Sequence, residues 1–111
     1  MKANEYQERA LVTAKYKSRE DMFLAGVLGA ASEAGEVAGK VEKRIRLGMG
    51  AYPSSPVEKL KVVKEMGDVL WFVAVAADAL GWTLEDVMWT NIHKLEDRDE
   101  RGQIHGDGDD R

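Results

Sequence analysis

The sequence predicts an all-α protein, a bundle-like subunit of four helices. No segment alternates apolar and polar residues with a period of two, and no β-branched run lies between turn signals, so strands are not expected. Apolar residues instead recur at helical spacing between capping residues and glycines. The length of 111 residues suits one domain, which we expect over residues 1–100, followed by a flexible, acidic, glycine-rich tail at 101–111.

The first two helices are predicted to begin at polar capping residues. Asn4 is expected to cap a first helix over residues 5–15. Ser18, with an acidic residue three positions later, is expected to begin a long second helix that runs to about Leu47, where Gly48 offers a C-cap. This helix contains several interior glycines, each of which costs roughly 1 kcal/mol relative to alanine. Their number indicates that a neighbouring backbone packs closely against it.

Two further helices are predicted by strong capping signals. The Ser-Pro-Val-Glu sequence at 55–58 combines a capping box with proline at the first helical position, and its helix is expected to end near Gly81. The Thr-Leu-Glu-Asp sequence at 83–86 is another capping box and predicts a fourth helix that ends near Asp99. Because the loop between the second and third helices is short, these two helices should pack antiparallel.

The end of the second helix is basic, and only Glu42 opposes its cations, which are Lys40, Lys43, Arg44 and Arg46. Cations near a helix C-terminus interact favourably with the helix dipole. The alternative interpretation is a contact with phosphate, and the sequence leaves both open.

Two pairs of carboxylates lie in the middle of the second and third helices. Glu33 and Glu36 are three residues apart, as are Glu65 and Asp68, so each pair lies on one helix face. By helix rise, Glu36 lies about 16 Å before the end of its helix, and Glu65 and Asp68 lie about 14 and 18 Å into theirs. Both pairs therefore reach the same height of an antiparallel hairpin. Four carboxylates do not converge in a core without a cation.

The alternative is that these acids are solvated and pair with lysines along their own helices. Lys40 follows Glu36 by four residues, and Lys64 precedes Asp68 by four. Asp68 also heads the apolar run 69–77, which is a poor position for a solvated face. The spacing therefore favours a carboxylate cluster.

The ligand type predicts the metal. Carboxylate oxygens without His or Cys favour Mg²⁺, with Mn²⁺ as a substitute, over zinc or copper. A di-iron bundle would be expected to pair Glu with His at i+3, a relation that neither His93 nor His105 has. An oxygen-only magnesium site with open water positions is typical of phosphate chemistry.

A polar face is expected on the fourth helix, where Asn91, Lys94 and Arg98 fall at i, i+3 and i+7. An inward amide beside two cations suits the phosphate oxygens or the ribose hydroxyl of a substrate. The alternative is an asparagine that satisfies a core hydrogen bond, with Lys94 and Arg98 extending to water.

Composition excludes several classes of protein. The formal net charge of −4 argues against a general nucleic-acid binder. The absence of cysteine excludes disulfides and zinc–thiolate sites. No apolar run approaches the length of a membrane span, and no signal peptide is recognisable, so we expect a cytoplasmic protein.

Three blocks of sequence, taken in order, resemble the MazG-like all-α nucleoside triphosphate pyrophosphohydrolases. Glu33-x-x-Glu36, followed after a gap of 28 residues by Glu65-x-x-Asp68, resembles that family's E-x-x-E…E-x-x-D signature. The Asn-Ile-His-Lys-Leu block at 91–95 is similar to the family as well.

The resemblance implies the all-α NTP pyrophosphatase fold, completed by assembly into a homodimer or homotetramer. It implies Mg²⁺-dependent hydrolysis of a (deoxy)nucleoside triphosphate to the monophosphate and pyrophosphate. The four carboxylates would hold the metal, and either Glu33 or Glu36 would orient or deprotonate the attacking water. Asn91 and Lys94 match nucleotide-contacting positions, and Arg98 is expected to join them. Neither a membrane nor a nucleic-acid polymer is expected as a partner.

Other functions stay open at this point. A phosphoribosyl-ATP pyrophosphohydrolase would share the carboxylates and differ in its acceptor pocket. A non-catalytic helical interaction module would keep the carboxylates as a metal-stabilised structural site, and it would bind Mg²⁺ without turnover. A plain dimeric bundle with solvated acids would show no effect of Mg²⁺ on its melting temperature.

Overall fold

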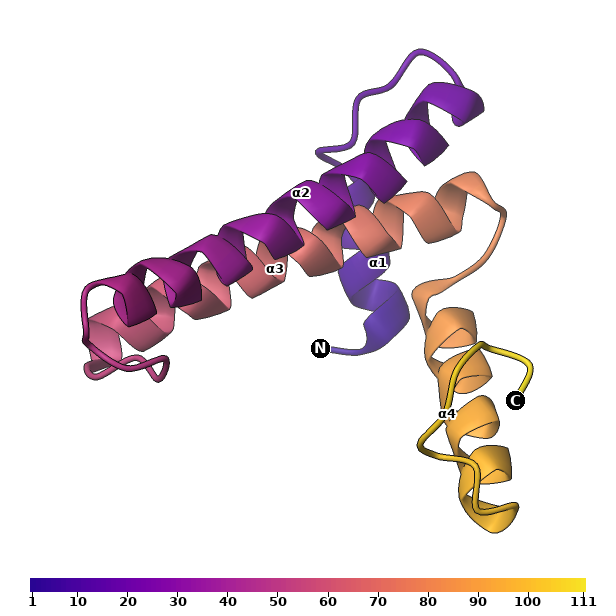
Figure 1. Cartoon of the computed structure of the whole chain (residues 1–111). Helices are drawn as coiled ribbons and strands as arrows, with labels where there is room; N and C mark the ends of the chain where they lie inside the picture. Colours follow the sequence, from indigo (N-terminus) through magenta and orange to yellow (C-terminus); the bar gives the residue numbers. More distant parts are fainter.

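The computed structural model describes residues 1–111 and contains four helices and no strand, which confirms the all-α prediction. The helices are α1 (Ala3–Leu11), α2 (Arg19–Arg46), α3 (Pro56–Ala79) and α4 (Leu84–Glu100). Figure 1 shows α2 and α3 as a long antiparallel hairpin, with α1 crossing α3 and α4 pointing away from the hairpin.

The predicted starts of the three longer helices are confirmed by their caps. The side chain of Ser18 accepts a hydrogen bond from the backbone N–H of Asp21, and Ser55 does the same for Glu58. At α4 the capping box is complete, because Thr83 and Asp86 each accept a hydrogen bond from the other's backbone N–H. These local bonds satisfy N–H groups that a helix cannot pair internally.

The prediction for α1 is wrong at both ends. The helix begins at Ala3, has Lys2 as its N-cap without a side-chain hydrogen bond, and ends at Leu11. Asn4 lies inside it, and its Oδ1 atom accepts a hydrogen bond of 3.0 Å from the backbone N–H of Glu85. Asn4 therefore caps the start of α4, a tertiary partner that local sequence does not reveal.

Gln7 fixes the junction of α1, α3 and α4. Its side chain is buried, and its Nε2 atom donates to the carbonyl oxygens of Ala74 and Trp82 at 3.1 and 3.2 Å. Its Oε1 atom accepts a hydrogen bond of 2.9 Å from the backbone N–H of Leu84. Both the nitrogen and the oxygen of the Gln7 side-chain amide form hydrogen bonds within the fold. Gln7 therefore has a structural role.

Two glycines of α2 allow the hairpin to close. A Cβ atom on the buried Gly26 would lie 2.8 Å from the backbone nitrogen of Ala76, and one on Gly29 would overlap the ring of Phe72. The expected close packing is thus confirmed at these positions. Gly35 and Gly39 differ, because a Cβ atom built on either would have no atom within 4 Å apart from its chain neighbours and the backbone of its own helix.

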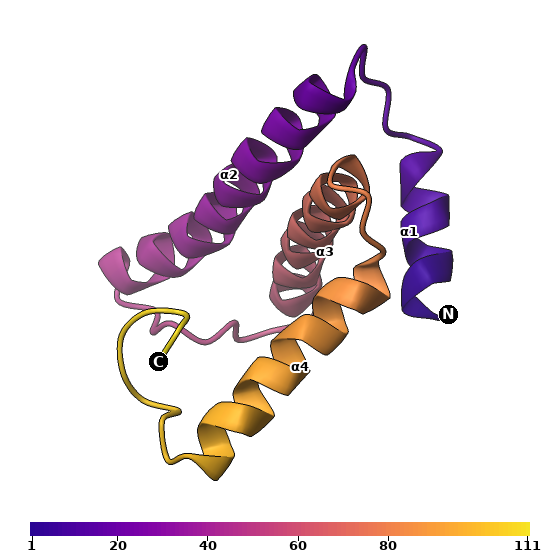
Figure 2. The same cartoon turned by 90° about the vertical axis from the view of Figure 1, so that its right-hand side faces the viewer.

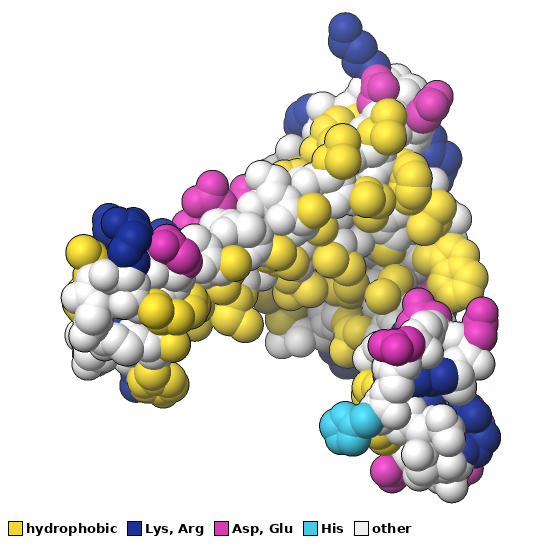
Figure 3. All heavy atoms as spheres, viewed as in Figure 1, with side chains coloured by type: hydrophobic (Ala, Val, Ile, Leu, Met, Phe, Trp, Pro, Cys, Tyr) yellow, Lys and Arg dark blue, Asp and Glu magenta, His cyan; other side chains and the backbone are white.

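The single chain has a small core. Only 9 of 111 residues are buried, and its apolar members are Ala10, Ala74, Val75, Ala77, Ala79 and Leu84. Large apolar side chains along the hairpin are exposed, and examples are Leu28 at 66%, Val63 at 59% and Met66 at 56%. Figure 3 shows such side chains spread over one face of the hairpin. One chain therefore leaves an extensive apolar surface uncovered.

Helix α4 does not close a bundle within one chain. It packs against α1 and α3 and makes no contact with α2. Figure 2 shows it lying across one end of the arrangement, with the C-terminal segment curling back beside it. None of the four helices alone has the length and hydropathy of a membrane span, and α3 and α4, which are bent by 99° relative to each other, reach those values only as a pair.

Candidate metal site

Three carboxylates converge in the middle of the hairpin. Glu33 on α2 and Glu65 and Asp68 on α3 each offer an oxygen atom, and these atoms lie within 4.8 Å of one another. Glu33 and Glu65 are half-buried, whereas Asp68 is exposed. The convergence follows from the antiparallel packing of two helices whose acids stand at the same height. We call these three residues the carboxylate cluster.

Glu36, the fourth acid in the predicted set, is exposed and lies outside this group. It is one helical turn from Glu33, and its charge contributes to a raised pKa of that residue. The structure therefore brings three of the four acids together and places Glu36 near them.

The cluster is electrostatically strained without a cation. The pKa of Glu33 is raised, first because burial disfavours its charged form and then because Asp68 and Glu65 carry like charges beside it. A hydrogen bond with Glu65 acts in the same direction. A divalent cation would reverse these effects by favouring the ionised carboxylates.

The lysine that faces the cluster crosses the hairpin. The Nζ atom of Lys40, on α2, lies 3.5 Å from the Oε1 atom of Glu65, on α3. The pairs along single helices, Glu36 with Lys40 and Asp68 with Lys64, do not form within 4.0 Å. One lysine against three acids leaves the cluster negatively charged.

The donor set suits a hard divalent cation. Three carboxylates without a sulfur or nitrogen ligand favour Mg²⁺ or Mn²⁺ over softer metals. Three protein oxygens also leave coordination positions for water and for the oxygens of a phosphorylated ligand.

The three polar residues of α4 lie elsewhere in the chain. Asn91 is exposed, and Lys94 and Arg98 are paired with the C-terminal segment. The Nζ atom of Lys94 lies 3.0 Å from Oδ1 of Asp109, and the Nη2 atom of Arg98 lies 3.4 Å from the same oxygen. Because α4 makes no contact with α2, one chain does not join these residues to Glu33.

Asp109 is a residue whose position sequence reasoning missed. The hydrogen bond from Lys94 and the charge of Lys94 lower the pKa of Asp109, and Arg98 acts in the same direction. The Arg98 side chain is 4% exposed, and its Nε atom is buried without a hydrogen-bond partner. The available signal was the aspartate content of 101–111, which is complementary to the cations of α4.

Comparisons with known proteins identify one family. The family model of the MazG nucleotide pyrophosphohydrolase domain matches residues 24–102, a segment that contains the carboxylate cluster, Glu36 and the polar residues of α4. The Gene 37 protein of Mycobacterium phage L5 is 40% identical over 84 residues, which are 76% of this chain and 72% of the phage protein. No solved structure matches the chain.

Proposed function

Because the chain belongs to the family of MazG nucleotide pyrophosphohydrolase domains, we propose that it hydrolyses a nucleoside or deoxynucleoside triphosphate to the monophosphate and pyrophosphate with Mg²⁺. The observation that carries this proposal is the convergence of Glu33, Glu65 and Asp68 from two helices. An oxygen-only donor set with open positions suits a cation that also binds phosphate.

The residues divide the chemistry between them. When bound, Mg²⁺ polarises phosphoryl oxygens and lowers the pKa of a water molecule. Glu33, Glu65 and Asp68 hold the cation, while Glu36, outside that group, accepts a hydrogen bond from the attacking water and orients it. Burial and the neighbouring carboxylates raise the pKa of Glu33, and a bound cation would favour its ionised form.

A second copy of the chain supplies the basic half of the site in this proposal. Asn91, Lys94 and Arg98 are kept from α2 in their own chain, so they reach a carboxylate cluster only in another subunit. The acidic cluster and the basic helix face are complementary in charge. An apolar groove between α2 and α3, whose lining includes Val37 and Met66, offers a surface for the same contact.

The test is pyrophosphate release from a panel of ordinary and modified ribo- and deoxyribonucleoside triphosphates, with Mg²⁺ or with EDTA. Glu36→Gln serves as the variant, and Glu42→Gln, an exposed acid paired with Arg46, serves as the control. Release that needs Mg²⁺, is lost in Glu36→Gln and persists in Glu42→Gln supports the proposal. A rise in melting temperature with Mg²⁺ but no release from any substrate would indicate a metal-stabilised module instead.

The oligomer is tested separately. Sedimentation equilibrium is expected to give at least a dimer at micromolar concentration. Mixing a Glu65→Gln chain with a Lys94→Ala chain is expected to restore activity, because a mixed dimer contains one site with both halves intact. A monomer that is active would contradict the shared site.

A further inference from the structure

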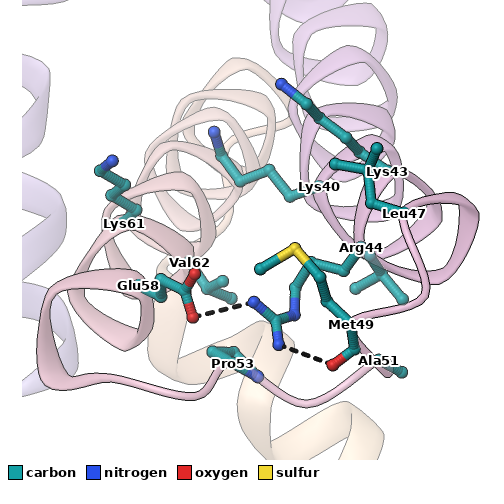
Figure 4. A pocket seen from close by; sticks show the side chains of 11 residues that line it. Lys40, Lys43, Arg44, Leu47, Met49, Ala51, Pro53, Glu58, Lys61 and Val62 are labelled. Carbon is teal, nitrogen blue, oxygen red and sulfur yellow. Dashed lines mark hydrogen bonds and ion pairs between the residues drawn. The ribbon is translucent and has the colours of Figure 1, made fainter.

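A basic pocket lies at the closed end of the hairpin, apart from the carboxylate cluster. The last turns of α2, the first turns of α3 and the loop between them enclose about 250 Å³. Four cations and one carboxylate line it, and Figure 4 shows them from close by. The cations are Lys40, Lys43, Arg44 and Lys61, and the carboxylate is Glu58.

Arg44 and Glu58 form one wall of the pocket and neutralise each other. The Nη1 atom of Arg44 lies 2.9 Å from Oε2 of Glu58, and its other nitrogens donate to the carbonyl oxygens of Met49 and Gly50 at 3.1 and 3.0 Å. Glu58 also accepts hydrogen bonds of 2.8 Å from the backbone N–H and hydroxyl of Ser54. The hydrogen bonds of Arg44 and Glu58 are therefore used to fix the loop between α2 and α3.

Three lysines then remain without a carboxylate of the pocket to pair with. Lys43 and Lys61 form no ion pair in the chain, and Lys40 is paired only at the edge, with Glu65. In Figure 4 the ammonium ends of all three lie above the Arg44–Glu58 pair. An excess of positive charge around a concave surface attracts an anion.

The helix dipole does not explain this arrangement. It favours Lys43 near the C-terminus of α2, but Lys61 lies in the N-terminal half of α3. The two lysines come from different helices and line the same hollow, and both are exposed. Apolar residues, among them Leu47, Met49 and Pro53, line the rest of the pocket.

We propose that this pocket is a second site, which binds the condensed phosphate group of pyrophosphate or of a nucleoside triphosphate. Lys40, Lys43 and Lys61 donate charge-assisted hydrogen bonds to its oxygens. The apolar wall accommodates the base when the ligand is a nucleotide. Lys61 lies one helical turn before Glu65, so the pocket adjoins the carboxylate cluster without sharing its ligands.

The experiment measures pyrophosphate binding by titration calorimetry in EDTA. Without a divalent cation the carboxylate cluster repels anions and turnover does not occur, so binding that is lost in a pocket variant and kept in a control reports on the basic pocket. The variant is Lys43→Ala/Lys61→Ala, which keeps Lys40 and its contact with Glu65. The control is Lys15→Ala/Lys17→Ala, which removes the same charge from exposed positions between α1 and α2.

We expect the Kd for pyrophosphate to rise at least about tenfold in the pocket variant and to stay within about twofold in the control. Equal weakening in both variants would show attraction by overall charge only and would overturn the site. Absence of pyrophosphate binding to the unaltered chain in EDTA would overturn it as well. Melting curves of both variants confirm that the folded state is retained.

Two further measurements identify the source of the phosphate. A nucleoside triphosphate with a non-hydrolysable α–β bridge is titrated under the same conditions, and tighter binding than pyrophosphate assigns the pocket to nucleotides. If the pocket receives pyrophosphate released at the carboxylate cluster, the pocket variant reduces product inhibition in the Mg²⁺-dependent assay. Unchanged product inhibition, together with lost binding in EDTA, assigns the pocket to a separately bound ligand.

Discussion

The α2–α3 hairpin and α4 differ in how their charged side chains are held. In the hairpin, contacts at Gly26 and Gly29 bring two long helices together, and acids on both helices converge. Helix α4 is attached near its N-terminal turn, and its cations are bound by Asp109 of the same chain. One chain therefore brings three carboxylates together, whereas the polar residues of α4 lie away from α2.

The largest effect is expected from breaking the carboxylate cluster. Glu65→Gln replaces one carboxylate of the cluster with a neutral amide and removes the ion pair with Lys40, so Mg²⁺-dependent pyrophosphate release should fall about a hundredfold or more. Glu42→Gln removes an acid of the same helix pair outside the cluster and should leave the rate nearly unchanged. Equal losses in both variants would mean that overall charge, and not the cluster, determines the rate.

A side chain added at one glycine of α2 should disrupt the packing of the hairpin, whereas one added at another glycine should not. Gly26→Val should destabilise the fold by about 1–3 kcal/mol or more, because its side chain meets the backbone of Ala76. Gly35→Ala meets no atom within 4 Å and should be neutral or stabilising by up to about 1 kcal/mol. Urea unfolding of the two variants measures the difference, and similar midpoints would argue against the close approach.

A smaller effect is expected from the segment 101–111 that follows α4, and there the variant should improve substrate binding. Asp109→Asn removes the carboxylate from Lys94 and Arg98, so the KM for a nucleoside triphosphate should fall about two- to fivefold. Asp110→Asn changes the net charge equally at a neighbouring residue without an ion pair. If both variants behave alike, Asp109 does not compete with the substrate.

The smallest effect concerns pH and the loop of the hairpin. Hydrogen bonds from Ser54 and the charge of Arg44 lower the pKa of Glu58 below its usual 4.5. Its contribution to stability is therefore complete above pH 4.5 and is lost as the pH falls from there through the lowered folded-state pKa. Glu58→Gln should flatten this part of the curve of melting temperature against pH. An unchanged curve would mean that other carboxylates cause the loss of stability at low pH.

Local signals predicted most of the fold. Capping residues such as Ser18, Ser55 and Thr83 act within four residues of their own helix starts, so the sequence contains both partners. Asn4 misled the prediction because its partner, Glu85, is 81 residues away. Capping chemistry identifies a suitable side chain and does not identify which helix it will cap.

The candidate site divides in the same way. The convergence of Glu33 with Glu65 and Asp68 followed from helix spacing and the length of one loop. Contacts of the tail have no period, so the pairing of Asp109 with Lys94 could not be predicted. The proposed roles of Asn91, Lys94 and Arg98 in substrate binding stay predictions, because they depend on a second subunit.

The most direct test of the acidic half is a crystal grown with Mn²⁺, measured for anomalous scattering by the metal. A peak is expected about 2 Å from oxygens of Glu33, Glu65 and Asp68, with Glu36 nearby and not among its ligands. No peak at the hairpin, or one held by other residues, would contradict the claim that the hairpin forms a divalent-cation site.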